Sequence, residues 1–398
     1  MHNIPFSPPR VDDRTVEAVT EVLRSGWITT GPKTAQFETE LAEYIGVDKV
    51  LALNSWTNAC ELVLRWFGVG EGDEVILPAY TYAATANIVM HVGATPVLVD
   101  SLPDHCHINP HAIAEAVTER TKVIMPVDIG GMPVDYDGIW SVINDKKSLF
   151  RPNSSEQKKL GRILFLSDAA HSFGAKYKGK QIGQQADISG YSFHAVKNLT
   201  TAEGGALAFN LQNKEDNEEL YRRLRISALH GQTKDALSKT DGNWRYDIIE
   251  AGFKCNMTDI QAAMGLVELS RYDETLACRK SICERYDEAF IDGPFIIPPQ
   301  QDDDRETSYH LYQLRLRNGC ERDRDALIDA LREQGISSNV HFQPLPLLSF
   351  YREQGYHMSD YPNAWKAYEN EISLPVWYGM TREMVARVSH AVQELWRG

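Results

Sequence analysis

The sequence has no long hydrophobic run and no leader of recognisable design. No stretch of about 18 apolar residues occurs among its 398 residues, so no membrane-spanning helix is predicted. The first residues lack the basic and then apolar pattern of a secretory signal, and no lipidation motif is present. We therefore expect a cytoplasmic protein.

Paired cysteines are also missing. Without C-x-x-C spacing the six cysteines favour reduced thiols over a disulfide framework. They are Cys60, Cys106, Cys255, Cys278, Cys283 and Cys320. The closest approach to a metal motif is "DHCH" at residues 104–107. We interpret it as a polar loop and predict no metal site, because Asn109 can cap a following helix that Pro110 begins.

Basic residues are fewer than acidic ones, 41 against 55, which gives a formal net charge of -14. A surface of this sign repels polyphosphates and makes nucleic acid an improbable partner. A small anionic ligand remains possible, because backbone N–H groups at the start of a helix bind phosphate whatever the global charge.

Short β-branched runs alternate with amphipathic stretches over the first two thirds of the chain. This pattern predicts a large α/β domain, residues 1–245, with a mostly parallel seven-stranded sheet. From residue 246 onward a long helix over 258–290 is expected to connect to a smaller α+β domain, with strands over 309–317 and 337–342 and a helix over 324–335. The basic, proline-broken segment 146–161 is expected to be a surface excursion, with a partner-binding loop as the alternative.

A lysine and an acid follow two of the predicted strands. Lys197 lies in "SFHAVKNLTTAEGG" and Asp168 ends "RILFLSD". A lone lysine is most often a surface charge and a lone acid a helix cap, but open α/β sheets place ligands at the ends of their strands. Together the two side chains suggest pyridoxal phosphate chemistry, which needs an amine for a Schiff base and a carboxylate at the pyridine nitrogen.

Two further stretches fit such a cofactor. A predicted strand ends and a helix with periodic apolar residues begins at Ser55, Thr57 and Asn58. Backbone amides and side-chain hydroxyls there could bind a phosphate together. A helix with an ordinary N-cap is the simpler alternative. Tyr80 and Tyr82 follow the next strand and offer an aromatic face, although aromatic residues are more often core.

Taken together these motifs resemble the DegT/DnrJ/EryC1/StrS family of sugar aminotransferases over nearly the whole chain. The resemblance rests on "SFHAVKNLTTAEGG", "SDAAHSFGA", "SGWITTGPKTAQFE", "GDEVILPAYTYAAT" and "FKCNMTDIQAAMG". It implies pyridoxal-phosphate-dependent transferase fold type I, as in aspartate aminotransferase, and a homodimer whose active sites lie at the subunit interface.

The resemblance also implies roles for individual residues. Lys197 would form the internal aldimine, Asp168 would hold the pyridinium, and Tyr82 would stack on the ring, with His171 near the ring substituents. The residues implied to bind the phosphate are Thr57, Asn58 and Ser192, joined by Asn256 from the neighbouring subunit. In two places the chain departs from many relatives, with Asp128 in place of a histidine and Ser167 in place of a glutamate. Because of the first difference, the substrates of those relatives are a weaker guide to the substrate of this chain.

By the same resemblance, L-glutamate would convert the cofactor to pyridoxamine phosphate, which would then aminate a nucleotide-linked keto sugar, with a UDP-linked 4-keto-6-deoxy sugar favoured. A sugar dehydratase of the same family is an alternative, but those enzymes carry histidine in place of the lysine. A non-catalytic cofactor-binding regulator is another. A dinucleotide-binding dehydrogenase is disfavoured because the glycines of "GVGEGDEV" follow a helix and precede a strand.

Candidate substrate contacts are less specific. Trp27 and Thr30 belong to a glycine-punctuated loop, residues 25–34, that could reach the partner's site. The remaining candidates are polar residues in or beside apolar stretches, where a hydrogen-bonded core residue is an equally common outcome. They are His194, His230, Tyr309, His310, His341 and Gln343.

Overall fold

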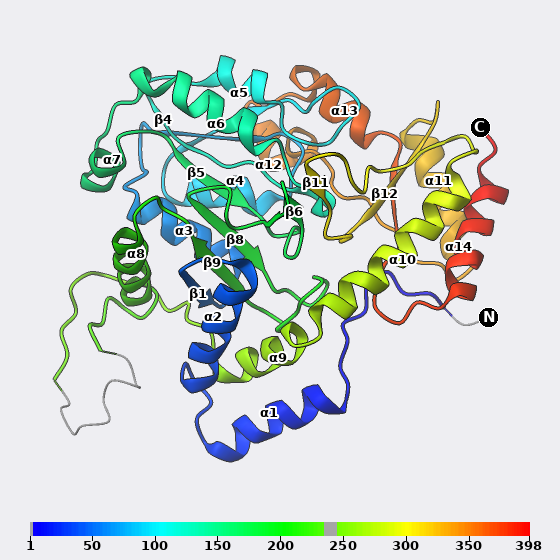
Figure 1. The fold of residues 1–398 in the computed structure, drawn as a ribbon. Coiled ribbons are helices and arrows are strands. Elements are labelled where there is room, and N and C mark those ends of the chain that lie inside the picture. The colour runs from blue at the N-terminus through cyan, green and yellow to red at the C-terminus, as the bar shows by residue number, and fades with distance from the viewer. Residues whose placement is uncertain (1–2, 235–244) are drawn as a thin grey trace.

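The computed structural model describes residues 3–234 and 245–398. A seven-stranded sheet forms its centre, in the order β1-β9-β8-β5-β4-β2-β3 (Figure 1). These strands are β1 (Lys49–Leu53), β2 (Glu74–Pro78), β3 (Thr95–Val99), β4 (Thr121–Ile124), β5 (Leu164–Asp168), β8 (Ile188–Ser192) and β9 (Gly205–Phe209). Each of them falls within one of the β-branched runs of the sequence.

The sheet is mostly parallel. Strands β3, β2, β4, β5 and β8 pair in parallel, whereas β9 runs antiparallel to both of its neighbours, β8 and β1. Because β9 is reversed, its first residue, Gly205, lies level with Leu53 and Ser192, the last residues of β1 and β8. The carboxyl ends of the parallel strands and the start of β9 therefore share one edge, and the predicted seven-stranded sheet is confirmed.

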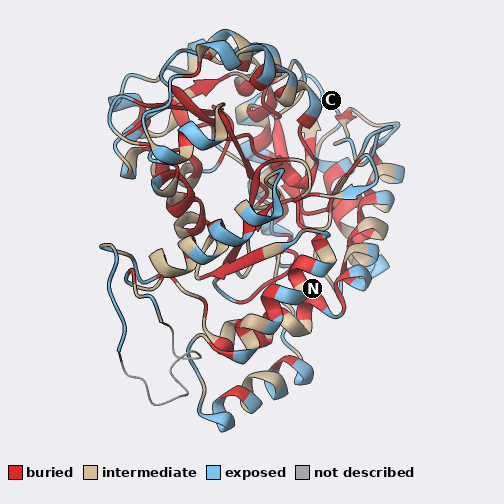
Figure 2. Ribbon diagram, turned by 60° about the vertical axis from the view of Figure 1, so that its left-hand side comes forward, coloured by how far each residue is buried: buried red, intermediate tan, exposed pale blue. Residues whose placement is uncertain are grey.

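Helices cover the sheet, and its strands are buried almost throughout (Figure 2). The helices of this part of the chain are α1 (Asp13–Ser25), α2 (Pro32–Ile45), α3 (Trp56–Trp66), α4 (Ala83–His91), α5 (Pro110–Ala116), α6 (Tyr136–Asp145), α7 (Ser155–Leu160) and α8 (Lys214–Ser227). As predicted, Asn109 caps α5 by accepting a hydrogen bond from the backbone N–H of His111. No helix among the described residues is long and apolar enough to cross a membrane.

The C-terminal part has its own antiparallel sheet and its own hydrophobic cluster. The sheet contains β10 (Phe295–Ile296), β12 (Tyr312–Leu316) and β13 (Glu371–Leu374). The helices are α9 (Asp259–Leu269), α10 (Tyr272–Phe290), α11 (Glu321–Glu333), α12 (Ser349–Glu353), α13 (Pro362–Tyr368) and α14 (Arg382–Leu395). Ile4 belongs to this cluster, whereas Tyr351 and Tyr368 pack with the core of the large sheet. The division at residue 245 stays a prediction.

Two predictions for the C-terminal part are wrong. The helix over 258–290 is divided into α9 and α10 at Ser270 and Arg271, where the buried guanidinium of Arg271 pairs with Glu268 and Asp12. Residues 337–342 form no strand. Only Asn339 makes an isolated bridge there, to Ser373, and the carbonyl oxygen of His341 instead accepts a hydrogen bond from Tyr80 of the large domain.

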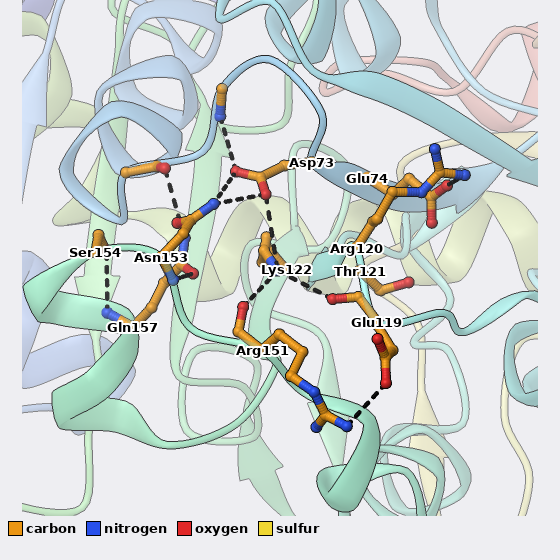
Figure 3. Close-up of polar contacts among 12 residues, drawn as sticks. Asp73, Glu74, Glu119, Arg120, Thr121, Lys122, Arg151, Asn153, Ser154 and Gln157 are labelled. Carbon is orange, nitrogen blue, oxygen red and sulfur yellow. Dashed lines mark hydrogen bonds and ion pairs between the residues drawn. The ribbon is translucent and has the colours of Figure 1, made fainter.

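Segment 146–161 is tied to the body of the protein by polar contacts with Asp73 and Lys122 (Figure 3), which lie at the starts of β2 and β4 and so at the opposite end of these strands from the shared edge. The amide of Asn153 donates to both carboxylate oxygens of Asp73, at 2.8 and 3.0 Å, just before β2 begins. The buried amine of Lys122 donates to the carbonyl oxygen of Arg151 at 2.6 Å and lies 3.7 Å from Asp73. The expected surface excursion thus contains a helix, α7, and is anchored by buried polar groups.

Candidate active site

Lys197 lies in the turn between β8 and β9, at the shared edge of the sheet. Its backbone N–H donates to the carbonyl oxygen of His194 at 2.9 Å, which closes the turn. Burial lowers the pKa of the Lys197 amine to about 8, against an opposing contribution from the Asp168 carboxylate. Part of this amine is therefore neutral near physiological pH, as a nucleophile requires.

Asp168 is the last residue of β5, and its side chain is buried. One carboxylate oxygen accepts from the hydroxyl of Thr85 at 2.9 Å and the other from the backbone N–H of Ala170 at 3.2 Å. Burial raises the pKa of this carboxyl group to about 7, with the nearby Lys197 acting in the opposite direction. A buried carboxylate with a raised pKa is poised to bind a cationic partner.

Three histidines lie close enough to Lys197 to be affected by its charge. His171 and His310 have ring centroids 4.4 Å apart, and the His171 ring lies 5.6 Å from Phe342. The pKa values of His171 and His310 are well below normal and that of His341 falls to about 3, in each case because of burial and the positive charge of Lys197. These rings are neutral at physiological pH.

The His341–Phe342 segment is held by groups from both parts of the chain. The backbone N–H of His341 donates to Glu371 at 3.0 Å, and its ring Nδ1 lies 2.9 Å from the Ser373 hydroxyl. The buried hydroxyl of Tyr80 donates to the His341 carbonyl oxygen at 2.7 Å. These bonds bring the Phe342 ring to 5.5 Å from the ring of Tyr82.

Tyr82 is 62% exposed, which is unusual for a residue so close to the core of the protein. It precedes α4, one turn before Thr85, whose hydroxyl donates to Asp168. Tyr80 points the other way, into the core. The sequence did not distinguish the two tyrosines, and the structure leaves only Tyr82 with an available aromatic face.

The start of α3 is a second cluster at the same edge. Ser55 caps the helix by accepting from the N–H of Asn58 at 3.1 Å, as its predicted position requires. No described residue accepts a hydrogen bond from the N–H groups of Trp56 and Thr57, which lie in the first turn of the helix at the positive end of its dipole. A Cβ at Gly205 would lie 2.4 Å from the backbone of both Ser55 and Trp56. Glycine is thus required where β9 passes this helix.

Asn256 and Thr30 meet beside this cluster. Asn256 forms a bridge with Leu53, and its amide donates to the Thr30 hydroxyl at 2.6 Å. Asp259, at the start of α9, accepts from the N–H groups of Gly31 and Thr34 at 2.8 and 2.9 Å. These bonds hold the 25–34 loop against the segment that carries Asn256.

Other candidates from the sequence have side chains that contact other groups. The exposed His194 is 3.6 Å from Glu203, and His230 is exposed on the segment that follows α8. Tyr309 packs into the C-terminal cluster, with its hydroxyl 3.4 Å from Glu306. Trp27 donates to the Thr30 carbonyl oxygen at 3.1 Å. Among the described residues, no hydrogen bond joins any of these four side chains to Lys197 or Asp168. Their roles stay predictions, as does that of the exposed Gln343.

Asp128 and Ser167, the two residues that differ from many relatives, both contact the hydroxyl group of Tyr136. Tyr136 donates to Asp128 at 2.9 Å and lies 2.7 Å from the hydroxyl of Ser167. Asp128 also accepts from Ser172 at 2.6 Å and from the N–H of Val134 at 2.8 Å. Because its side chain is buried and accepts these three hydrogen bonds, Asp128 supports the turn beneath His171, and its effect on the substrate stays a prediction.

Several residues that border the site are not among the site residues predicted from the sequence. Thr85 stands in the same "YTYAAT" stretch as the tyrosines, and Asn198 directly follows the lysine. Phe342 was expected within a strand. Phe6 stacks on His341 at 5.3 Å, and Ser7 donates to the Val196 carbonyl oxygen at 3.2 Å, so the N-terminal segment also borders the site.

Comparison with known proteins gives this geometry a context. The sequence model of the DegT/DnrJ/EryC1/StrS aminotransferase family matches residues 9–393. The chain is 37% identical over 402 aligned positions to the spore coat polysaccharide biosynthesis protein SpsC of Bacillus subtilis, covering 100% of this chain and 98% of SpsC.

Solved structures agree. The pyridoxal phosphate form of the putative sugar aminotransferase Spr1654 from Streptococcus pneumoniae superposes with a TM-score of 0.95 at 43% identity, over 99% of this chain and 98% of that one. Its pyridoxamine phosphate form gives 0.96 at 45%, over 99% of both chains. Helicobacter pylori PseC, an aminotransferase of pseudoaminic acid biosynthesis, gives 0.85 at 28%, over 99% of this chain and 98% of PseC. The chain therefore belongs to the DegT/DnrJ/EryC1/StrS family and is a pyridoxal-phosphate-dependent sugar aminotransferase of fold type I.

Proposed function

We propose that the protein transfers an amino group from L-glutamate to the keto group of a nucleotide-linked sugar, a UDP-linked 4-keto-6-deoxy sugar, and that it does so as a homodimer. The observation that carries the proposal is the convergence of Lys197 and Asp168 at one edge of the sheet, in a chain of this family. SpsC is named for polysaccharide biosynthesis, which supports an amino sugar destined for a polysaccharide as the product.

The residues at this edge fit pyridoxal phosphate. The free N–H groups at the start of α3, with Thr57, Asn58 and Ser192, would hold the phosphate; the exposed face of Tyr82 would cover the ring. The close approach of Gly205 leaves the α3 amides unobstructed by a side chain. When bound, the cofactor supplies an aldehyde that captures amines and a ring that accepts electron density.

Lys197 would act first as the nucleophile that binds the cofactor. Its lowered pKa keeps part of the Nζ amine neutral, which is the form that attacks a carbonyl carbon. Once displaced by the amino donor, the same Nζ would take a proton from the substrate carbon and return it nearby, as a general base and then a general acid. A pKa near the working pH suits both directions of that transfer.

Asp168 would pair with the ring nitrogen. Its buried carboxylate is held in place by Thr85 and Ala170, so little reorganisation is needed when a cation binds. The negative charge raises the pKa of the nitrogen and keeps it protonated. His171, neutral and close to the lysine, would contact a substituent of the ring.

Exposed apolar residues near the site support a homodimer. Tyr82, Ile28 and Val196 are 62%, 50% and 41% exposed around the shared edge, and Ile248 and Ile249 are about half exposed on the segment after α8. Large apolar side chains exposed to this extent are typical of surfaces that are covered in an assembled protein. In the proposed dimer Asn256 contributes to the phosphate site of the partner subunit.

An absorption spectrum tests the first half of the reaction. We expect a band at roughly 410–430 nm that borohydride removes, with the cofactor fixed to Lys197 by peptide mass, and a shift toward about 330 nm when L-glutamate is added to untreated protein. An amino-sugar product from a screen of nucleotide keto sugars would support the second half, whereas a deoxy sugar would indicate a dehydratase. If the reconstituted protein has no such band and Lys197→Ala behaves identically, the proposal fails.

A further inference from the structure

Asn198 joins the lysine turn to the C-terminal part of the chain. Its amide Nδ2 donates to the carbonyl oxygen of Ser308 at 2.7 Å, and its Oδ1 lies 2.9 Å from Nδ1 of His310. A carbonyl oxygen only accepts hydrogen bonds, so the Asn198 atom that faces Ser308 must be the NH₂ group. The oxygen therefore faces His310, and Nδ1 of His310 must carry the ring proton.

A second backbone group fixes the other ring. The N–H of Gly130 donates to Nδ1 of His171 at 3.2 Å. A backbone N–H only donates, so Nδ1 of His171 is unprotonated and the proton of the neutral ring is on Nε2. Ser308 contributes here as well, because its hydroxyl donates to the His171 carbonyl oxygen at 2.5 Å.

The two rings therefore have opposite tautomers side by side. His171 carries a donor at Nε2 and His310 a lone pair at Nε2, and among the described residues neither Nε2 atom forms a hydrogen bond. Both side chains are almost entirely buried, at 6% and 5% exposure. The cations that act on His310 are Lys197 and Arg279, and both oppose its protonation.

We propose that Asn198 is a positioning residue that holds His310 as a hydrogen-bond acceptor beside the donor of His171, so that the two rings together bind one hydroxyl group in the active site. A hydroxyl oxygen accepts from His171 and its proton is donated to His310. An ammonium group cannot accept, and a carboxylate cannot donate, so neither satisfies both rings. The hydroxyl belongs to the sugar or to the cofactor ring, and in this respect the inference rests on the proposed function.

The tautomers are measured by nitrogen NMR on protein labelled with ¹⁵N-histidine, free of cofactor. The chain has 12 histidines, and the two signals are assigned from their loss in His310→Gln and His171→Gln. We expect protonated Nδ1 in His310 and protonated Nε2 in His171. Protonated Nε2 in His310, or a rapid mixture of its tautomers, overturns the proposal. This measurement needs no activity, so it stands even if the aminotransferase proposal fails.

Ligand additions identify the hydroxyl. A change in the Nε2 signal of His310 when pyridoxal phosphate is added assigns it to the cofactor ring. A change only when the UDP-linked 4-keto-6-deoxy sugar is added to the pyridoxamine form assigns it to the sugar. No change with either ligand overturns the hydroxyl-binding role.

Substitution of Asn198 shows whether this residue sets the tautomer of His310 or only stabilises the fold. Asn198→Ala is expected to let both His310 tautomers form and to weaken binding of the hydroxyl-bearing ligand by about tenfold, the usual cost of one hydrogen bond to a buried group. Asn153→Ala is the matched control, since its side-chain amide also donates to a buried group, the carboxylate of Asp73, which lies just before β2 and away from the site. The control is expected to lower the unfolding midpoint without altering the His310 signals. Equal effects of both substitutions on those signals would contradict the proposal.

Discussion

The pKa of Lys197 has a direct consequence for cofactor binding. At pH 8 about half of this amine is neutral, whereas a lysine with an ordinary pKa of about 10.5 is neutral in less than about 1% of molecules. We expect the rate of reconstitution with pyridoxal phosphate, followed at about 420 nm, to rise with pH and to level off slightly above pH 8. The same measurement with a free lysine derivative corrects for ionisation of the cofactor itself. A rate that keeps rising to pH 10 would show that the amine is not perturbed.

Asp168 makes the cofactor-free protein less stable as the pH rises. Its pKa is raised from 3.8 to about 7, so the unfolded chain loses this proton first and the folded state loses stability between about pH 4 and 7. Asp168→Asn removes this penalty. We expect the cofactor-free variant to be more stable than the wild type at pH 8, on the order of 2 kcal/mol, with a smaller difference at pH 5.

Urea unfolding at the two pH values, without cofactor, measures this difference. The same variant is expected to lose most of its activity, because a neutral amide does not hold a protonated ring nitrogen. A variant less stable than the wild type at both pH values would mean that the hydrogen bonds of Thr85 and Ala170 outweigh the cost of burying the charge.

Asp259 acts at the level of secondary structure, because it caps a helix other than its own. Its carboxylate accepts from three backbone N–H groups at the start of α2, those of Gly31, Lys33 and Thr34. Asp259→Ala is expected to lower the free energy of unfolding by about 1–3 kcal/mol, and also to weaken cofactor binding, since the loop that holds Asn256 through Thr30 is released.

Thr381→Ala provides the comparison for Asp259. Thr381 caps α14 through the N–H of Met384 at 3.3 Å, away from the site. We expect it to cost about 1 kcal/mol of stability and to leave the dissociation constant of pyridoxal phosphate unchanged. If Asp259→Ala also leaves that constant unchanged, the loop does not support the cofactor site.

Secondary-structure elements with a clear pattern of apolar residues could be predicted from the sequence. Elements whose ends depend on contacts with residues distant in the chain could not. The seven sheet strands are short, mostly apolar runs because both faces of the sheet are covered, and Ser55 and Asn109 mark the starts of α3 and α5. The break at Arg271 depends on Asp12, which lies 259 positions away along the chain. Residues 337–342 have the composition of a strand, but Tyr80 and Glu371 hold them in another conformation.

The same limit applies to the site. Lys197 and Asp168 could be predicted because Asp168 ends one buried strand and Lys197 lies in the turn after another, at the same edge of the sheet. Asn198 and His310 are 112 positions apart, and no local pattern indicates that an amide and an imidazole will meet. The tautomers that result depend on two backbone groups, at Gly130 and Ser308, whose positions only the folded chain determines.

The whole-molecule question is which chain supplies Asn256 to each active site. In the proposed dimer Lys197 and Asn256 of one site come from different subunits, so two defective chains can complement each other. A heterodimer of one Lys197→Ala chain and one Asn256→Ala chain would have one site with both defects and one site with neither. We expect the purified heterodimer to have about half the activity of the wild-type dimer, although each homodimeric variant loses most of its activity.

Two different affinity tags on coexpressed chains allow the heterodimer to be isolated and assayed for the glutamate half-reaction by absorbance. Its mass should be about 90 kDa, twice the 44.9 kDa of the chain. If Asn256 served the site of its own chain, every site in the heterodimer would carry one defect and no activity would return. Within one chain Asn256 already bridges to Leu53, at the end of the strand that leads to Ser55 and the α3 amides. Complementation therefore decides between a phosphate contact across the interface and one within the subunit.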